Sequence, residues 1–164
     1  MATLSEAFAA QAASDLDVYE VLAGSTVPSS HRLHYLQMWL EKLCKAYLWL
    51  PEGAADELRI RHNVVDKILP RMIGEHWRRI GFEQRPDIVA IRQICREIDL
   101  LHPQVDDNGR RPDNVEYPWI GTSGNAEVPA HCEFALTRRL YSNSGRLLIK
   151  AAVSLTRKPT VFAK

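Results

Sequence analysis

Apolar residues recur every three or four positions along most of this chain, which is the period of one face of an α-helix. Leu33, Leu36, Leu40, Leu43 and Tyr47 trace one such stripe. No segment shows the convincing alternation of a half-buried strand. The pattern therefore predicts an all-α fold, a bundle of about five helices in a single domain over residues 1–164. The predicted helices span residues 3–23, 29–50, 55–80, 86–101 and 131–155.

Residue types that begin and end helices stand at several of these boundaries. Thr3 and Glu6 have the spacing of a capping box, in which each side chain bonds the other residue's backbone N–H. Gly24 and Gly81 stand where helices commonly stop. The run Ser142-Asn143-Ser144-Gly145 is typical of a turn, so we expect it to interrupt the last helix.

A polar stripe runs beside the apolar one on the predicted second helix. It consists of His34, Gln37, Glu41 and Lys45. Glu41 and Lys45 have the favourable i,i+4 order, which stabilises an exposed helix by a few tenths of a kcal/mol. The stripe therefore indicates a solvent-facing side of this helix.

The helical period disappears in a long irregular loop before the last helix, over residues 102–130. Loops of this length in compact domains are usually functional or disordered. Aromatic residues beside prolines are more typical of a docked loop, so we expect this one to lie across the bundle. Its candidate binding residues are Arg110, Arg111, Asn114, Glu116, Tyr117 and Trp119.

Composition narrows the class of protein. Hydrophobic residues make up 46% and charged residues 25% of the chain, which excludes a disordered tail or a fibrous repeat. No stretch approaches the roughly 20 apolar residues that span a bilayer, so no membrane partner is expected. Three cysteines without a Cys-x-x-Cys pair favour a reducing compartment. We therefore expect a cytoplasmic protein.

Charge is concentrated at the two ends of the chain. Residues 131–164 hold seven Lys or Arg and one acid, a net charge of +6, and residues 1–30 hold four acids and no Lys or Arg. A basic segment of this kind can neutralise phosphates. It can equally pack against the acidic first thirty residues or form a solvated helix face. The sequence leaves these alternatives open.

Familiar catalytic and metal-binding motifs are absent. The chain has no Gly-rich phosphate loop, no Gly-x-Ser-x-Gly elbow and no His-Glu-x-x-His zinc signature. His31 and His34 are three residues apart, but no Cys or acid at a ligand spacing supports them. We therefore expect neither a metal nor a cofactor.

The first two predicted helices resemble those of HEPN domains (higher eukaryotes and prokaryotes nucleotide-binding). The resemblance rests on residues 31–48, where Tyr35 and Gln37 precede Glu41-Lys42-Leu43 and Lys45-Ala46, and on the run Ala12-Ala13-Ser14-Asp15-Leu16 in the first helix. It covers the first 50 residues, and the later chain matches only in architecture. The resemblance implies a small helical bundle, often a homodimer, used in bacterial toxin–antitoxin or phage-defence systems.

Catalytic HEPN proteins are metal-independent ribonucleases with an Arg, four to six residues and then a His. In such a pair the Arg stabilises charge on a phosphate and the His acts as general acid or base. Arg96 and His102 fit this spacing and are the first choice, and Arg71 and His76 are the second. However, a chain with six histidines and fifteen arginines is expected to contain such pairs by chance. The family motif also often has a tyrosine two residues after the His, and neither pair has one.

The sequence therefore favours a HEPN-like, non-catalytic binding module whose ligand is a partner protein, a nucleotide or RNA. The alternative is a metal-independent ribonuclease toxin that acts as a homodimer. A third reading is a purely structural homodimer that uses Trp39 and Trp49 as an apolar contact.

Overall fold

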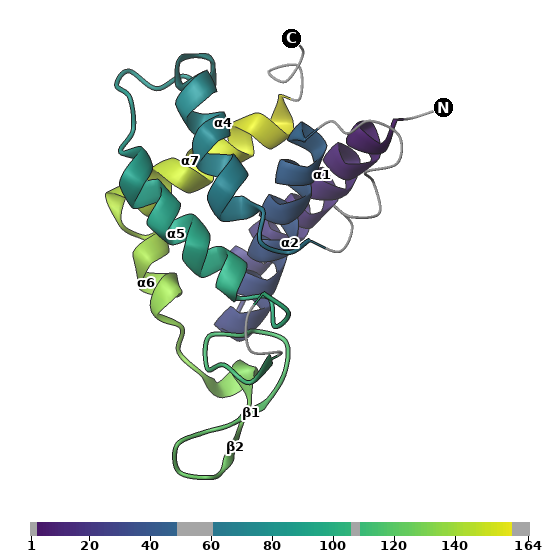
Figure 1. The fold of residues 1–164 in the computed structure, drawn as a ribbon, viewed down its shortest axis with the longest axis vertical. Helices are drawn as coiled ribbons and strands as arrows, with labels where there is room; N and C mark the ends of the chain where they lie inside the picture. The colour runs from purple at the N-terminus through teal and green to yellow at the C-terminus, as the bar shows by residue number, and fades with distance from the viewer. Residues whose placement is uncertain (1–2, 49–60, 106–108, 159–164) are drawn as a thin grey trace.

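The structure is a computed structural model that describes residues 3–48, 61–105 and 109–158. It is mostly helical, so the prediction of an all-α bundle is confirmed (Figure 1). Its elements are α1 (Leu4–Ala23), α2 (Ser29–Tyr47), α4 (Val65–Ile80), α5 (Ile88–Leu100), β1 (Trp119–Ile120), β2 (Ala126–Glu127), a 3-10 turn η2 (Pro129–His131), α6 (Ala135–Leu140) and α7 (Asn143–Arg157).

Helices α1 and α2 form an antiparallel hairpin. The hydroxyl of Ser5, at the start of α1, donates to the carbonyl of Ala46 near the end of α2 at 2.6 Å. Helices α4 and α5 pack on this hairpin, and α7 contacts α1, α2, α4 and α5. The short β1–β2 hairpin projects away from the helices at one end of the molecule (Figure 1). One hydrophobic core connects all the long helices.

Several predicted boundaries are confirmed. Thr3 and Glu6 form the reciprocal capping box at the start of α1. Gly24 ends this helix, and Gly81 ends α4 with a backbone φ of 95°, a left-handed conformation that glycine adopts without steric cost. Local sequence therefore specifies these helix ends.

Other boundaries are corrected by the structure. Residues 61–64 are not helical, so α4 begins later than predicted, and residues 49–60 lie outside the described part of the chain. The expected interruption of the last predicted helix is confirmed, because α6 ends at Leu140 and α7 begins at Asn143. It lies just before the predicted run, since Ser142 is the N-cap of α7 and its hydroxyl accepts from the Gly145 N–H. Residues 132–134, which were also predicted to be helical, precede α6 and are not. Strands β1 and β2 were missed because two residues are too few to show alternation.

Trp39 is fully buried, which corrects the reading that placed it on an apolar homodimer surface. Its indole Nε1–H donates to the Thr156 hydroxyl of α7 at 2.8 Å. Trp49 lies outside the described residues. Among the helices of the described segments, none is long and apolar enough to cross a membrane.

The start of α4 is capped by a residue from another helix. Val64 precedes α4 and provides no side-chain hydrogen bond, but both carboxylate oxygens of Asp99 on α5 accept from the N–H groups of Val65 and Asp66, at 3.1 and 2.9 Å. Asp99 is only 3% exposed. Burial raises the pKa of Asp99 to about 7, and the nearby carboxyl of Asp66 also raises it. The two backbone N–H bonds act in the opposite direction and lower this pKa.

Stability is expected to fall as pH rises from about 4 to 7 through the titration of Asp99. Because its pKa in the folded chain lies above the ordinary value of 3.8, the folded state binds this proton more tightly than the unfolded state. The stabilisation is fully present at low pH and is lost as pH passes 7, with a slope of up to about 1.4 kcal/mol per pH unit. Urea unfolding of wild type and Asp99→Asn across this range tests this, and equal slopes in the two proteins would contradict it.

Candidate functional site

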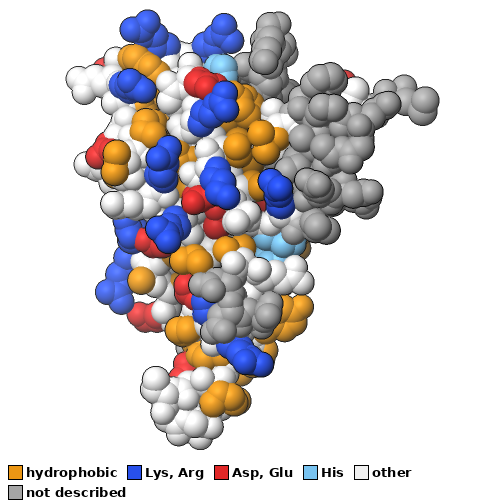
Figure 2. Space-filling view, viewed as in Figure 1, with side chains coloured by type: hydrophobic (Ala, Val, Ile, Leu, Met, Phe, Trp, Pro, Cys, Tyr) orange, Lys and Arg blue, Asp and Glu red, His pale blue; other side chains and the backbone are white. Residues whose placement is uncertain are grey.

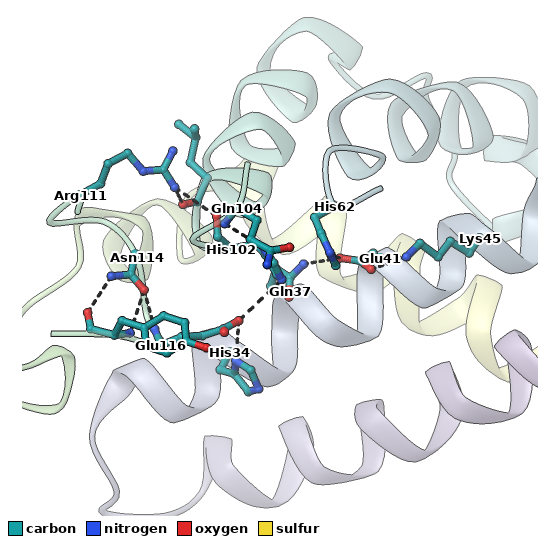
Figure 3. Close-up of polar contacts among 12 residues, drawn as sticks. His34, Gln37, Glu41, Lys45, His62, His102, Gln104, Arg111, Asn114 and Glu116 are labelled. Carbon is teal, nitrogen blue, oxygen red and sulfur yellow. Dashed lines mark hydrogen bonds and ion pairs between the residues drawn. The ribbon is translucent and has the colours of Figure 1, made fainter. Parts of the chain in front are cut away.

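Three histidines and two glutamates from distant segments meet along one side of α2 (Figure 3). Helix α2 contributes the polar stripe His34, Gln37, Glu41 and Lys45, and His62, His102 and Glu116 come from segments later in the chain. We call these seven residues the histidine–glutamate cluster. Sequence reasoning placed the stripe on a solvent-facing side, but Gln37, Glu41 and Lys45 are all buried.

Glu41 is the buried centre of one half of the cluster. It accepts hydrogen bonds from Lys45 Nζ and from Gln37 Nε2, both at 2.6 Å. The Nδ1 atom of His62 lies 3.2 Å from Oε2, the oxygen that also accepts from Gln37. A buried carboxylate must be paired in this way because its desolvation is costly.

His102 is held between His62 and Glu116. The rings of His62 and His102 are stacked, with centroids 3.7 Å apart and planes 7° from parallel. The backbone N–H of Gln104 donates to His102 Nδ1 at 3.2 Å, so the proton of the neutral ring is on Nε2, which lies 4.0 Å from Glu116. Burial lowers the pKa of His102, and the neighbouring His62 lowers it further.

Glu116 connects His102 to α2. Its carboxylate also lies 3.6 Å from His34 Nδ1, and this contact holds the pKa of Glu116 below its ordinary value. The side chain of His34 is 34% exposed, compared with 12% for His102. Solvent therefore reaches the cluster mainly at its His34 end.

The irregular loop is fixed by Asn114, which is fully buried. Its Oδ1 accepts from the N–H groups of Glu116 and Tyr117 at 2.8 and 2.9 Å, and its Nδ2 donates to the carbonyls of Gly109 and Tyr117 at 3.1 and 2.7 Å. Arg111 donates to the carbonyls of Leu100 and His102 at the end of α5. Residues 111–116 are therefore docked against α2 and the end of α5, as predicted, whereas the β1–β2 hairpin later in the loop projects away from the helices (Figure 1).

Of the predicted loop residues, Asn114, Arg111 and Glu116 therefore hold the loop and the cluster together. Tyr117 is 57% exposed, whereas Trp119 is only 6% exposed. A hollow of about 350 Å³ opens beside the β-hairpin, and it is lined by Arg110, Pro118, Trp119, Ile120 and Ala126.

The structure places the first-choice catalytic residues in different environments. His102 belongs to the histidine–glutamate cluster, whereas Arg96 is exposed on α5 and lines a separate hollow with Lys67, Asp66 and Asp99. The groups that the structure places against the histidine rings are the carboxylates of Glu41 and Glu116, which repel phosphate.

The second-choice pair also has local partners. Arg71 forms an ion pair with Glu75 on the same helix at 2.8 Å. His76 packs edge-on against the ring of Tyr47, with centroids 6.2 Å apart. Both side chains therefore already have partners, Arg71 on α4 itself and His76 on α2.

His34, Glu41 and His62 were missed as members of the site. The polar stripe on α2 was the signal that could have found the first two, because a stripe of this kind is either solvated or covered by polar partners. No pattern in the neighbouring sequence identifies His62 as a member of the site, because its contacts are with residues 21 and 40 positions away. Within the described segments, no three His, Cys, Asp or Glu side chains are arranged to hold a metal ion.

Charge pairing within the bundle explains part of the basic C-terminal segment. Arg157 of α7 forms ion pairs with Asp17 and Glu20 of α1, and Arg139 pairs with Glu97 of α5. The acidic start and basic end of the chain therefore meet, as one of the alternatives predicted. Comparison with protein-family models, curated proteins and solved structures finds no match to this chain.

Proposed function

We propose that this chain is a HEPN-like module of a bacterial defence or toxin–antitoxin-type system, and that it binds RNA without cleaving it. The observation that carries the proposal is a basic surface on α4 and α5. Figure 2 shows Lys and Arg side chains spread over these helices, with acidic groups between some of them. We call this surface the α4–α5 basic face, and its exposed cations are Lys67, Arg71, Arg78, Arg79, Arg92 and Arg96.

Most of these cations are available to a ligand. Glu75 and Glu97, the glutamates of α4 and α5, are already paired with Arg71 and Arg139. Lys67, Arg92 and Arg96 have no carboxylate within 4 Å in the part of the chain that the structure describes. Cations that are not neutralised internally can displace counterions from a phosphate backbone, which is the main source of affinity for nucleic acids.

Lys67 and Arg96 form the centre of this face because they line one hollow from opposite helices. Asp66 and Asp99 lie in the same hollow. Because the pKa of Asp99 is about 7, its negative charge is only partly present at neutral pH. Positive charge therefore exceeds negative charge where the two helices meet, which favours a phosphate there.

Binding without cleavage is supported by the separation of Arg96 from His102. A ribonuclease of the implied type needs an Arg beside the His, so that charge on the phosphate is stabilised where the proton is transferred. Here His102 contacts His62 and Glu116, and Arg96 lines a different hollow.

Reversing the charges of Lys67 and Arg96 is expected to weaken RNA binding. The double variant Lys67→Glu plus Arg96→Glu should lose at least about tenfold in affinity for a labelled single-stranded RNA, with a shallower dependence on salt. The matched control is Arg138→Glu plus Lys158→Glu, which changes the net charge equally at two exposed cations on α6 and at the end of α7. Fluorescence anisotropy measures both, and an equal loss in the two variants would show that only net charge matters.

A metal-independent ribonuclease remains the second candidate, and the stacked rings of His62 and His102 favour it. The lowered pKa of His102 keeps this ring neutral near pH 7, as a general base requires. The catalytic pair would then be completed in a homodimer, because the resemblance implies that the motifs of two subunits meet. This candidate predicts RNA cleavage in EDTA that His102→Ala abolishes.

A further inference from the structure

A second hollow lies on a different part of the molecule, where the end of α1 and the start of α2 meet α6 and α7. Its volume is about 560 Å³, within the range of pockets that hold small ligands. It belongs neither to the histidine–glutamate cluster nor to the α4–α5 basic face. The residues that define its chemistry are Tyr19, Arg32, Tyr141, Arg146, Ile149 and Lys150.

Positive charge dominates this hollow. Arg32, Arg146 and Lys150 line it, and no carboxylate is among the residues of the described chain that line it. The nearest acids of α1 in the sequence, Asp17 and Glu20, are already paired with Arg157. Three cations that share one hollow repel each other unless an anion lies between them, so their arrangement favours an anionic ligand.

Arg32 is incompletely satisfied by the protein. Its Nη1 donates to the Tyr141 hydroxyl at 3.4 Å, but its Nε is buried and has no hydrogen-bond partner within the described residues. Buried guanidinium N–H groups normally have acceptors because leaving them unpaired is costly. Because this Nε is closed off from solvent, a ligand with several anionic oxygens would bind the other N–H groups of the guanidinium, which lines the hollow.

The walls of the hollow are aromatic and apolar. The Tyr141 side chain is 59% exposed, and its ring lies 6.0 Å from the guanidinium carbon of Arg32. Tyr19 is held in place by packing against Trp39, with ring centroids 5.6 Å apart. Leu140 and Ile149 complete the apolar part. A flat ring is the ligand group that such a surface suits best, because bases stack on exposed tyrosines.

We propose that this hollow binds a nucleoside phosphate. The base stacks on Tyr141 beside Ile149, and the phosphates bind Arg32, Arg146 and Lys150. A free nucleotide and the 5′-phosphorylated end of an RNA both provide this chemistry. The proposal does not depend on RNA binding by the α4–α5 basic face, because the two surfaces share no residue.

Isothermal titration calorimetry of the full chain with ATP tests the proposal. We expect wild type to bind ATP, and Arg146→Glu plus Lys150→Glu to weaken binding at least about tenfold. Lys67→Glu plus Arg96→Glu should bind ATP like wild type. Tyr141→Ala should weaken binding about five- to tenfold, whereas Tyr141→Phe should preserve it because it keeps the ring. Equal melting temperatures of these exposed-residue variants, measured by circular dichroism, show that each is folded.

Three further ligands separate the sources of the phosphate and the role of the base. Binding of a 5′-phosphorylated RNA decamer but not of ATP, lost in the α7 double variant, supports the site with an RNA end as its ligand. A decamer with a 5′-hydroxyl should bind this hollow less tightly. Pyrophosphate that binds as tightly as ATP would overturn the proposal, and so would wild-type levels of binding in the α7 double variant or no binding of any of these ligands.

Discussion

Replacing Glu41 by alanine is expected to destabilise the protein by about 3–5 kcal/mol, because it leaves the ammonium group of Lys45 buried without its main partner. The Lys45 side chain is only 3% exposed and lies 2.6 Å from the carboxylate. Gln37 and His62 lose their acceptor at the same time. Since a domain of this size has a total stability of about 5–15 kcal/mol, this loss is a large fraction of the total.

Urea unfolding of a double-mutant cycle measures this effect. The variant Glu41→Leu plus Lys45→Met removes both charges and should recover most of the lost stability, because replacing a buried ion pair by apolar groups is often neutral. The matched control is Glu75→Ala on α4, which breaks an i,i+4 pair with Arg71 that is largely exposed. The loss of stability in this control should be much smaller, because solvent screens exposed ion pairs. A Glu41→Ala variant as stable as Glu75→Ala would contradict this account.

Replacing Asn114 by alanine is expected to release the loop from the bundle and to cost about 3 kcal/mol. The variant leaves two buried N–H donors and two carbonyl acceptors without their partner, and each unsatisfied buried group costs about 1–3 kcal/mol before the loop relaxes. The position of Glu116 depends on these bonds, because its own N–H is one of the donors. The contacts of Glu116 with His34 and His102 should therefore be lost as well.

Thermal unfolding and limited trypsin digestion measure the two parts of this prediction. Trypsin can cleave after Arg110, whereas Pro112 blocks cleavage after Arg111, so a released loop is cut at Arg110 much faster than in wild type. The control Asn114→Asp keeps an acceptor for the two N–H groups but loses both donated bonds. Its stability should therefore lie between those of wild type and Asn114→Ala. A variant Asn114→Ala that melts like wild type, with a loop that is cut equally slowly, would show that other contacts hold this segment.

Local sequence was sufficient for those parts of the fold that depend on neighbouring residues. The capping box of Thr3 and Glu6 and the left-handed end at Gly81 are formed by contacts within a few residues. The start of α4 could not be predicted in this way, because its cap is Asp99, more than thirty residues later. A two-residue strand likewise carries no pattern of its own.

The histidine–glutamate cluster was only partly predictable for the same reason. A polar stripe on a helix is usually solvated, and the α2 stripe gave no sign that His62, His102 and the loop would cover it. His102 and Glu116 were identified as candidates separately, but neither was connected to α2. The pairing of Arg157 with Asp17 and Glu20 was one of the open alternatives, and charge totals alone could not identify the partners.

Incubation of the purified chain with labelled single-stranded RNA in EDTA, with binding and RNA length measured in the same samples, tests the central claim most directly. We expect wild type to bind the RNA and leave it intact, and we expect Lys67→Glu plus Arg96→Glu to bind at least about tenfold more weakly. Cleavage by wild type that disappears in His102→Ala would contradict the claim and establish the ribonuclease. RNA that stays both intact and unbound at low salt would contradict both functions.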